Sequence, residues 1–185
     1  MSNTAPNTAS DMTDILTDTL PNTLPDTLTD TASNTSSDSA PNIVANTILL
    51  SVRPEYAKKI LAGTKKVELR RARPRLEPGD RVLVYVSSPQ KAVVGSFQVE
   101  EIVEESLPAL WEMVEAKAGI SPEEFYNYYE GVSTGVGIFF KEIRPFNQPV
   151  ALGLLRKRWS SWRPPQSYRY MSNTEYNMVR ELGEG

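Results

Sequence analysis

An abrupt change in composition after residue 46 limits how much of this chain can form a folded core. Residues 1–46 consist mostly of Thr, Asn, Asp, Ser and Pro, and they contain six Asp but no Lys or Arg. Their few apolar residues follow neither the period of a strand nor a sustained helical period. Such a segment cannot bury enough surface to offset the entropy lost on ordering. The sequence therefore predicts a disordered tail over 1–46, or a weak partner-binding motif at 15–28, followed by one folded domain over 47–185.

The net charge of the whole sequence is negative only because residues 1–46 are acidic. The whole sequence has 20 Lys and Arg against 23 Asp and Glu, so 20 basic and 17 acidic residues remain over 47–185, a net charge of +3. Residues 53–91 carry eleven Lys or Arg and four acids, whereas 100–130 carry nine Glu and one Lys. A basic face of this kind favours an anionic ligand such as a nucleic acid. The alternative is that the basic and acidic segments pair with each other.

Cysteine and histidine are both absent from the sequence. Their absence excludes disulfides, thiolate nucleophiles, Cys/His zinc sites and histidine-based triads, and the sequence points to no metal and no cofactor. No segment approaches the roughly 20 apolar residues of a membrane span, and the N-terminus does not resemble a secretory signal. We therefore expect a cytoplasmic protein without membrane contact. The sequence does not indicate an oligomeric state.

Short apolar runs separated by turn residues predict a mixed α+β domain. Strands are expected at 47–52, 66–71, 81–88, 92–105 and 133–146. Helices are expected at 54–63, 106–119, 121–131 and 172–182. Proline in the first turn, glycine after the last, and Ser–Glu capping boxes mark helix ends. Because the order lacks βαβ alternation, we expect an α+β fold built on a small β-barrel of about five to six strands with flanking helices.

The basic stretch KKVELRR contains a single acid. A strand over 66–71 would place Lys66, Glu68 and Arg70 on one face and the intervening apolar residues toward the core. A glutamate among cations stays ionised and can accept hydrogen bonds from a base edge or a ribose. Arg70 and Arg71 can grip a phosphate. The alternative is a structural Glu68–Arg70 ion pair across neighbouring strands.

The stretch LSVRPEYAKKILAGTKKVELRR resembles the opening of the ASCH domains, a family of the PUA-like superfamily. The family signature Gly-x-Lys-x-x-Glu-x-Arg is met by Gly63, Lys65, Glu68 and Arg70. The segments EPGDRVLVYVSS and VVGSFQV follow in the family's order, so the resemblance covers about residues 47–170. It implies a PUA-like β-barrel with a cleft between the barrel and its helices, lined by the signature residues.

The resemblance implies a module that binds RNA or a modified nucleobase, in RNA metabolism or in the control of translation or transcription. One subgroup hydrolyses N4-acetylcytidine with a Lys, a Thr and a Glu. This chain has Glu68 at the Thr position and Gln98 near the Glu position, so only Lys65 carries over. Some members are reported as ribonucleases. The alternative function is therefore a small metal-independent enzyme, a ribonuclease or a modified-nucleoside amidohydrolase, in which Lys65 and Glu68 are the catalytic residues. A third hypothesis is a protein-interaction module that uses the acidic helices and the tail.

A second signal lies in RKRWSSWRPPQSYRY, which interleaves cations with aromatic residues. Bases stack on aromatic faces, at about 1–3 kcal/mol per base, while cations hold phosphates. Packing in the core is the alternative for Trp159 and Tyr168, and packing is favoured for Phe125 and Tyr129. The residues expected to bind RNA or a nucleoside are Arg53, Lys65, Glu68, Arg70, Arg71, Arg158, Trp159 and Tyr168.

Overall fold

The computed structural model describes residues 45–185, which belong to one compact unit. The predicted tail lies outside the described residues, except for 45 and 46. In the described part, the strands are β1 (Thr47–Val52), β2 (Val67–Arg70), β3 (Arg81–Val86), β4 (Ala92–Ser106), β5 (Thr134–Ala151) and β6 (Tyr168–Tyr170). The helices are α1 (Pro54–Leu61), α2 (Leu107–Ala118), α3 (Pro122–Tyr128), α4 (Leu152–Arg158) and α5 (Asn173–Glu184).

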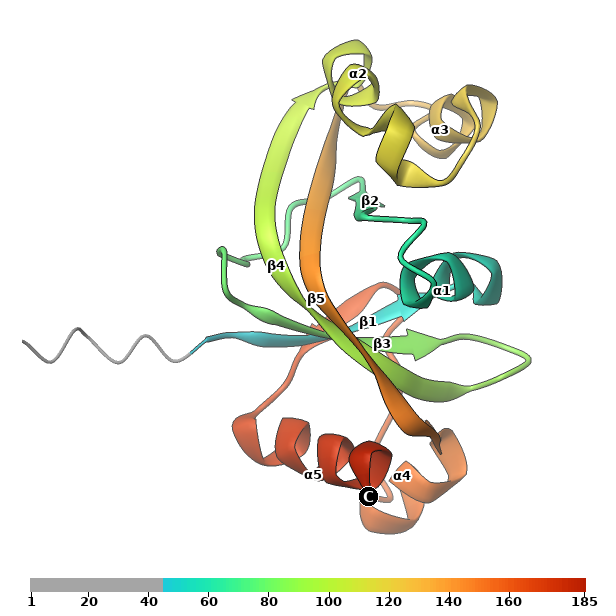
Figure 1. Ribbon diagram of the computed structural model, residues 1–185, viewed down its shortest axis with the longest axis vertical. Coiled ribbons are helices and arrows are strands. Elements are labelled where there is room, and N and C mark those ends of the chain that lie inside the picture. The colour runs from blue at the N-terminus through green and yellow to red at the C-terminus, as the bar shows by residue number, and fades with distance from the viewer. Residues whose placement is uncertain (1–44) are drawn as a thin grey trace, which may run out of the picture. The chain divides into compact units, whose positions relative to one another are not determined.

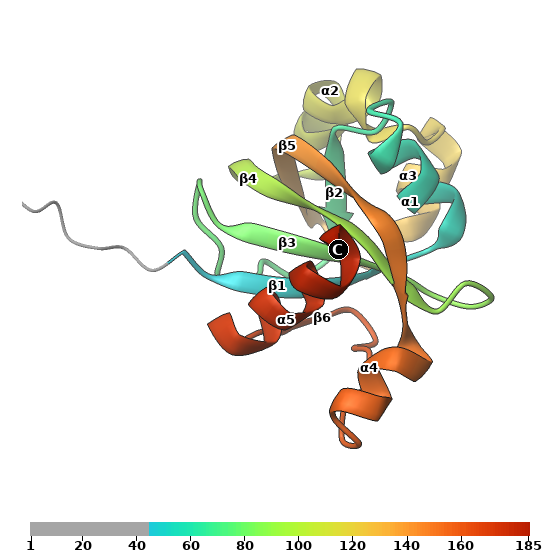
Figure 2. The same ribbon diagram turned by 60° about the horizontal axis from the view of Figure 1, so that its bottom comes forward.

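The six strands form one sheet in the order β2-β5-β4-β3-β1-β6, which curls into a half-barrel (Figures 1 and 2). β1 and β3 pair in parallel, and the other four pairings are antiparallel. The long β4–β5 ladder carries three register shifts, and bulges of this kind bend a sheet. One shift lies at Gly95, where a Cβ would meet the Arg144 carbonyl oxygen at 2.6 Å. The architecture confirms the predicted α+β fold with a barrel-like sheet and flanking helices.

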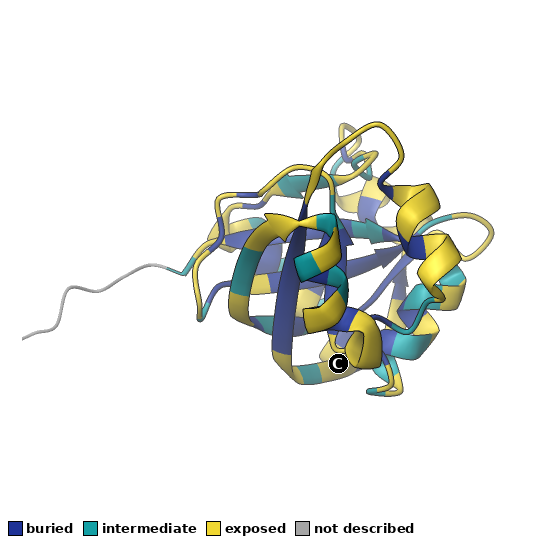
Figure 3. Cartoon of the chain, turned by 90° about the horizontal axis from the view of Figure 1, so that it is seen from above, coloured by how far each residue is buried: buried dark blue, intermediate teal, exposed yellow. Residues whose placement is uncertain are grey.

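Three separate apolar clusters stabilise the fold, and the strands that form them are buried along much of their length (Figure 3). The barrel core fills the inside of the curled sheet beneath α1. The α4–α5 core packs those two helices against the other face of the sheet. The α2–α3 core packs that helix pair against β2 and β5. Alternation along β1 illustrates the division, because Ile48 and Leu50 face the barrel core and Leu49 faces the α4–α5 core.

Local signals account for most helix ends. α1 begins at Pro54, and Gly63 follows its end with a φ of +72°, a conformation that glycine adopts without steric cost. α3 and α5 both begin with the predicted capping boxes. α4 and β6 were not predicted, because α4 is held by burial of Leu155 and β6 by pairing with β1, both long-range contacts. No helix within residues 45–185 is long and apolar enough to cross a membrane.

Candidate functional site

A pocket of about 660 Å³ is lined by residues of β1, α1, β2 and α3 and by the loop before β6. Its charged lining residues are Arg53, Lys65, Glu68, Arg70 and Glu124. Three cations and two carboxylates give a net charge of +1. Its uncharged lining includes Tyr56, Asn127, Tyr128 and Gln166. The pocket thus combines the charged side chains of β2 with aromatic and amide side chains that come from α1, α3 and the loop before β6.

Glu68 connects two cations in this pocket. Arg70 Nη2 donates a hydrogen bond to Glu68 Oε1 at 2.7 Å, and Lys65 Nζ lies 3.7 Å from Glu68 Oε2. Lys65 is only 3% exposed and Glu68 only 7%. The Glu68–Arg70 pair therefore forms within one strand, whereas the sequence alternative placed it across neighbouring strands.

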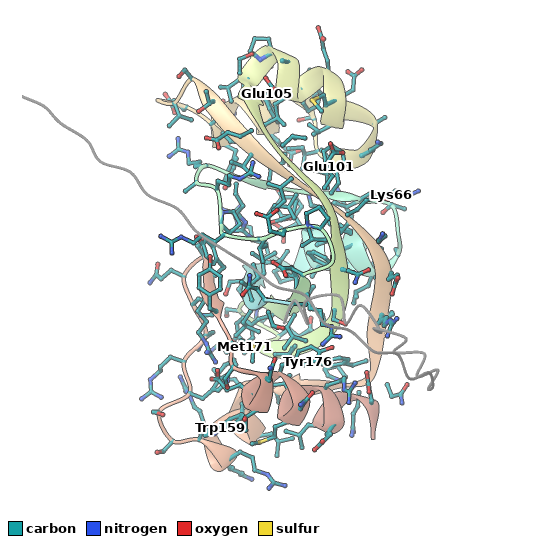
Figure 4. The ribbon with its side chains drawn as sticks, turned by 90° about the vertical axis from the view of Figure 1, so that its left-hand side faces the viewer. Lys66, Glu101, Glu105, Trp159, Met171 and Tyr176 are labelled. Atoms are coloured by element: carbon teal, nitrogen blue, oxygen red, sulfur yellow. The ribbon has the colours of Figure 1, made fainter. Side chains whose placement is uncertain are left out.

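The C-terminal end of α2 holds the Lys65 side chain in place. Lys65 Nζ donates to the Ala118 carbonyl at 2.9 Å, and Lys59 Nζ donates to the carbonyl of Gly119. The last carbonyls of a helix lack intrahelical partners and lie at the negative end of its dipole, so they favour cations. The predicted place of Lys66 beside Glu68 is wrong, because β2 begins only after Lys66 and the Lys66 side chain is exposed (Figure 4). Lys65, by contrast, is buried.

Burial shifts the proton affinity of several pocket groups. Desolvation lowers the pKa of Lys65 below its usual 10.5; Arg70 and Lys59 add to this effect and Glu68 opposes it. Desolvation raises the pKa of the Tyr56 and Tyr128 hydroxyls. The pocket therefore combines an ammonium that gives up its proton more readily with tyrosines that remain hydrogen-bond donors.

Arg70 also closes the open side of the half-barrel. Its strand, β2, stands at one end of the strand order, while β1 and β6 stand at the other. Arg70 Nη2 donates to the Ser51 carbonyl of β1 at 3.2 Å, and Nη1 donates to Ser167 Oγ, just before β6, also at 3.2 Å. One side chain thus joins the two ends of the sheet beside the pocket.

The family model of the ASCH domain matches residues 50–147. This chain belongs to the ASCH domain family. The ASCH domain-containing ribonuclease of Zymomonas mobilis is 30% identical over 134 residues, which cover 72% of this chain and 90% of that protein. The crystal structure of ASCH from Zymomonas mobilis superposes with a TM-score of 0.70 and 29% identity, over 74% of this chain and 94% of that one. Human THYN1, in complex with 5-methylcytosine-containing DNA, shares the fold at a TM-score of 0.50 and 12% identity, over 76% of this chain and 99% of that one.

The ASCH signature residues Lys65, Glu68 and Arg70 lie together in the pocket, and Arg53 joins them from the start of α1. Gly63 of the signature forms the turn that leads into β2. Gln98, which the sequence placed near a subgroup's catalytic Glu, does not line this pocket, and its amide donates to the Gly79 carbonyl at 3.1 Å. Within residues 45–185, no three His, Cys, Asp or Glu side chains are grouped so as to hold a metal ion.

The other residues predicted to bind a ligand do not line the pocket. Arg71 is exposed and donates to the Glu130 carbonyl. Arg158 lines a second pocket, with residues of α5. Trp159 packs against the α4–α5 core, far from Lys66 along the molecule (Figure 4), and Tyr168 packs against the barrel core. Four of the eight residues predicted to bind a ligand therefore line this pocket, which we call the ASCH pocket: Arg53, Lys65, Glu68 and Arg70.

Helix α3 contributes pocket residues that the sequence did not reveal. Phe125 and Tyr129 are buried in the α2–α3 core, as predicted. Their neighbour Tyr128 instead lines the ASCH pocket, together with Glu124 and Asn127. Residues three and four apart share one face of a helix, so this spacing was a usable signal. It could be interpreted only once the pocket was known to lie on that side of α3.

Proposed function

We propose that this ASCH domain takes one nucleotide of single-stranded RNA into the pocket and cleaves the chain there. The observation that carries the proposal is the arrangement of Lys65, Glu68 and Arg70, in which an ammonium of lowered pKa lies 3.7 Å from a carboxylate beside a guanidinium. Such groups suit proton transfer and the stabilisation of phosphate charge. The ribonuclease name of the Zymomonas mobilis relative supports the same reaction.

The rest of the pocket suits a nucleotide. Its volume of about 660 Å³ lies in the range of small-molecule sites. Tyr56 and Tyr128 offer aromatic rings for base stacking, and Asn127 and Gln166 offer amides for the base edge. An unpaired nucleotide is required, because a base held in a duplex cannot enter a pocket of this kind.

The proposed reaction is a transesterification. The Glu68 carboxylate accepts the proton of the ribose 2′-hydroxyl, whose oxygen then attacks the adjacent phosphorus. The Lys65 ammonium donates its proton to the departing 5′-oxygen as the phosphorus–oxygen bond breaks. Arg70 compensates the charge that develops on the phosphate oxygens. The products are a 2′,3′-cyclic phosphate and a 5′-hydroxyl end.

A binding module without catalysis is the second candidate function. The observation in its favour is that both cations already have partners, since Arg70 bonds Glu68 and the Ser51 carbonyl, and Lys65 bonds the Ala118 carbonyl. A prearranged network of this kind suits recognition, because no group must move to receive the ligand.

The test is incubation of the purified full-length chain with end-labelled single-stranded RNA, with and without a chelator. We expect a cyclic-phosphate product in both conditions, because Lys65 and Arg70 supply the positive charge. Lys65→Ala and Glu68→Gln should each lower the rate by about 10²-fold or more, the usual contribution of an acid or base. Lys66→Ala, which changes an exposed neighbour, is the matched control.

The possible outcomes separate the two candidates. Salt-dependent binding with no product, weakened by Lys65→Ala, would make the domain a binding module. Cleavage that survives both pocket substitutions would place the reaction elsewhere and overturn the proposal. Loss of cleavage in chelator would contradict the metal-independent mechanism.

A further inference from the structure

Residues 143–174 supply one pocket residue, Gln166, but the cations of this segment have no role in the reaction proposed above. Residues 143–174 contain six Lys or Arg and no Asp or Glu. Two of these cations form ion pairs, Arg144 with Glu142 and Arg169 with Glu175. The remaining four are exposed and form no ion pair among the described residues: Arg156, Lys157, Arg158 and Arg163.

Two of these arginines converge on one backbone oxygen. Arg156 Nε and Arg163 Nη1 donate to the Trp162 carbonyl at 3.5 Å and 3.0 Å. Trp162 is only 3% exposed and packs in the α4–α5 core, so its carbonyl has a fixed position. We call Arg156 and Arg163 the arginine pair. Arg158 is not part of it, because it lines the second pocket with α5.

Within residues 45–185, no carboxylate forms an ion pair with the arginine pair. A further cation, Arg169, lies 5.4 Å from the Trp162 ring and is already paired with Glu175. Two like charges held close together repel each other, and an anion between them removes that repulsion. The planar guanidinium matches the oxygens of a phosphate better than a point charge does.

The loop that carries Arg163 continues directly into the pocket. Gln166, three residues further on, lines it, and three extended residues span at most about 11 Å. The loop is fixed against β1, because Ser51 Oγ donates to the Pro165 carbonyl at 2.6 Å and Ser51 N donates to the Ser167 carbonyl at 2.8 Å. A strand that leaves the pocket along this loop would bring its next phosphates toward the arginine pair.

We infer that Arg156 and Arg163 bind a backbone phosphate of the RNA strand whose neighbouring nucleotide occupies the pocket. The substrate is then a single strand that extends beyond the pocket and not a free nucleotide. This inference rests on the proposed function, because it assumes RNA in the pocket. It adds a second contact point that does not take part in the reaction.

The test compares two double variants that remove the same charge. Arg156→Gln with Arg163→Gln removes the arginine pair, and glutamine can still donate to the Trp162 carbonyl. Arg144→Gln with Arg180→Gln is the control, because both of these arginines form ion pairs with nearby glutamates. Binding of a fluorescent, fully 2′-O-methylated single-stranded RNA, which cannot be cleaved, is measured by anisotropy over a series of NaCl concentrations.

We expect the arginine-pair variant to bind the RNA about tenfold more weakly at low salt, the effect of removing one charged hydrogen bond. Its slope of log affinity against log salt should fall by about 0.7 for each phosphate that the protein no longer neutralises. The control variant should keep the wild-type slope. Cleavage of an ApA dinucleotide should proceed at the wild-type rate in both variants, because its single phosphate is the one that is cleaved and no further phosphate reaches the arginine pair.

An equal decrease in slope in both double variants would overturn the inference, as would an unchanged slope in both. It would also be overturned if the arginine-pair variant bound RNA normally but failed to bind an aspartate-rich peptide that the wild type binds, since the surface would then serve an acidic protein. Thermal melting checks that the variant folds, and Arg163→Gln alone should give a smaller decrease in the same direction. Failure of the proposed function is separate, because it appears as cleavage unaffected by Lys65→Ala.

Discussion

At the scale of single residues, the surroundings of Lys65 determine its chemistry. Its ammonium is buried, donates to the Ala118 carbonyl and lies between Glu68 and two further cations, Lys59 and Arg70. Burial lowers its pKa, and the neighbouring charges act in opposite directions. The contribution of each neighbour can therefore be separated by substitution.

We expect NMR titration of the Lys65 ε-methylene to give a pKa below 10.5. Glu68→Gln should lower this pKa further, because it removes the anion that favours the ammonium. Lys59→Met should raise it, because it removes a nearby cation. The unfolded state binds more protons between the lowered pKa and the ordinary lysine value, so the free energy of unfolding should rise with pH across that window.

Lys157→Met is the control for this titration, because it removes an exposed lysine on a different helix. It should leave the Lys65 curve unchanged. Shifts in the same direction for Glu68→Gln and Lys59→Met would contradict the electrostatic account of the site.

At the scale of elements, α3 is fixed to β5 by a close contact between a ring and a glycine. The Tyr129 side chain is fully buried, and a Cβ at Gly135 would lie 2.6 Å from its ring. The Tyr129 hydroxyl lies 3.2 Å from the carbonyls of Arg70 and Val136, so it also connects the helix end to β2 and β5. Gly135 therefore permits the Tyr129 ring to pack closely against β5.

We expect Gly135→Ala to lower the free energy of unfolding by about 1–3 kcal/mol, as overpacking of a core does. Gly153→Ala in α4 is the matched control, because no atom lies within 4 Å of a Cβ built there. Urea denaturation of both variants measures the difference. Equal stability of the two variants would show that Tyr129 moves aside without cost.

The sequence predicted elements well where the signal was local. The strand at 47–52 and the capping boxes of α3 and α5 follow from apolar runs and Ser–Glu spacing, which need no knowledge of the rest of the chain. α4 was missed because the contacts that hold it, such as burial of Leu155, are with residues distant in the sequence. The inward direction of Lys65 was not predictable either, since it depends on carbonyls of α2 more than 50 residues away.

At the scale of the whole molecule, Arg70 joins ends of the sheet that the strand order leaves apart. Its hydrogen bonds reach Glu68 within β2, the Ser51 carbonyl of β1 and Ser167 before β6. The Arg70 and Glu68 side chains are only 12% and 10% exposed, so water can replace little of this network. The arginine therefore contributes to the closure of the half-barrel as well as to the pocket.

We expect Arg70→Met to lower the free energy of unfolding by about 3–5 kcal/mol, because it leaves a buried carboxylate without its closest partner. Combining it with Glu68→Gln should recover part of this loss, since the uncompensated charge is then removed. Urea denaturation of both variants at constant pH makes the comparison. A double variant no more stable than Arg70→Met alone would mean that the contacts between the strands, not the ion pair, carry the effect.

The general fold and the signature residues were predictable, but the extent of the site was not. Lys65, Glu68 and Arg70 are close in sequence, so one motif identifies them together. Tyr128 and Gln166 reach the same pocket from segments far along the chain, and only the curl of the sheet brings them there. Arg158 was predicted to bind the ligand because it lies in a basic, aromatic segment, but the fold places it in a different pocket.

The division of the interior into three clusters gives the pocket a further property. Tyr56, on one wall, packs against the barrel core, and Ile120, on another, packs against the α2–α3 core. A bound ligand would touch both walls and so connect the barrel core to the α2–α3 core. Part of its binding energy would then oppose local opening of α2 and α3, because any ligand that binds only the closed form stabilises it by mass action. Ligand occupancy of the pocket and the stability of α2 and α3 against local opening should therefore rise together.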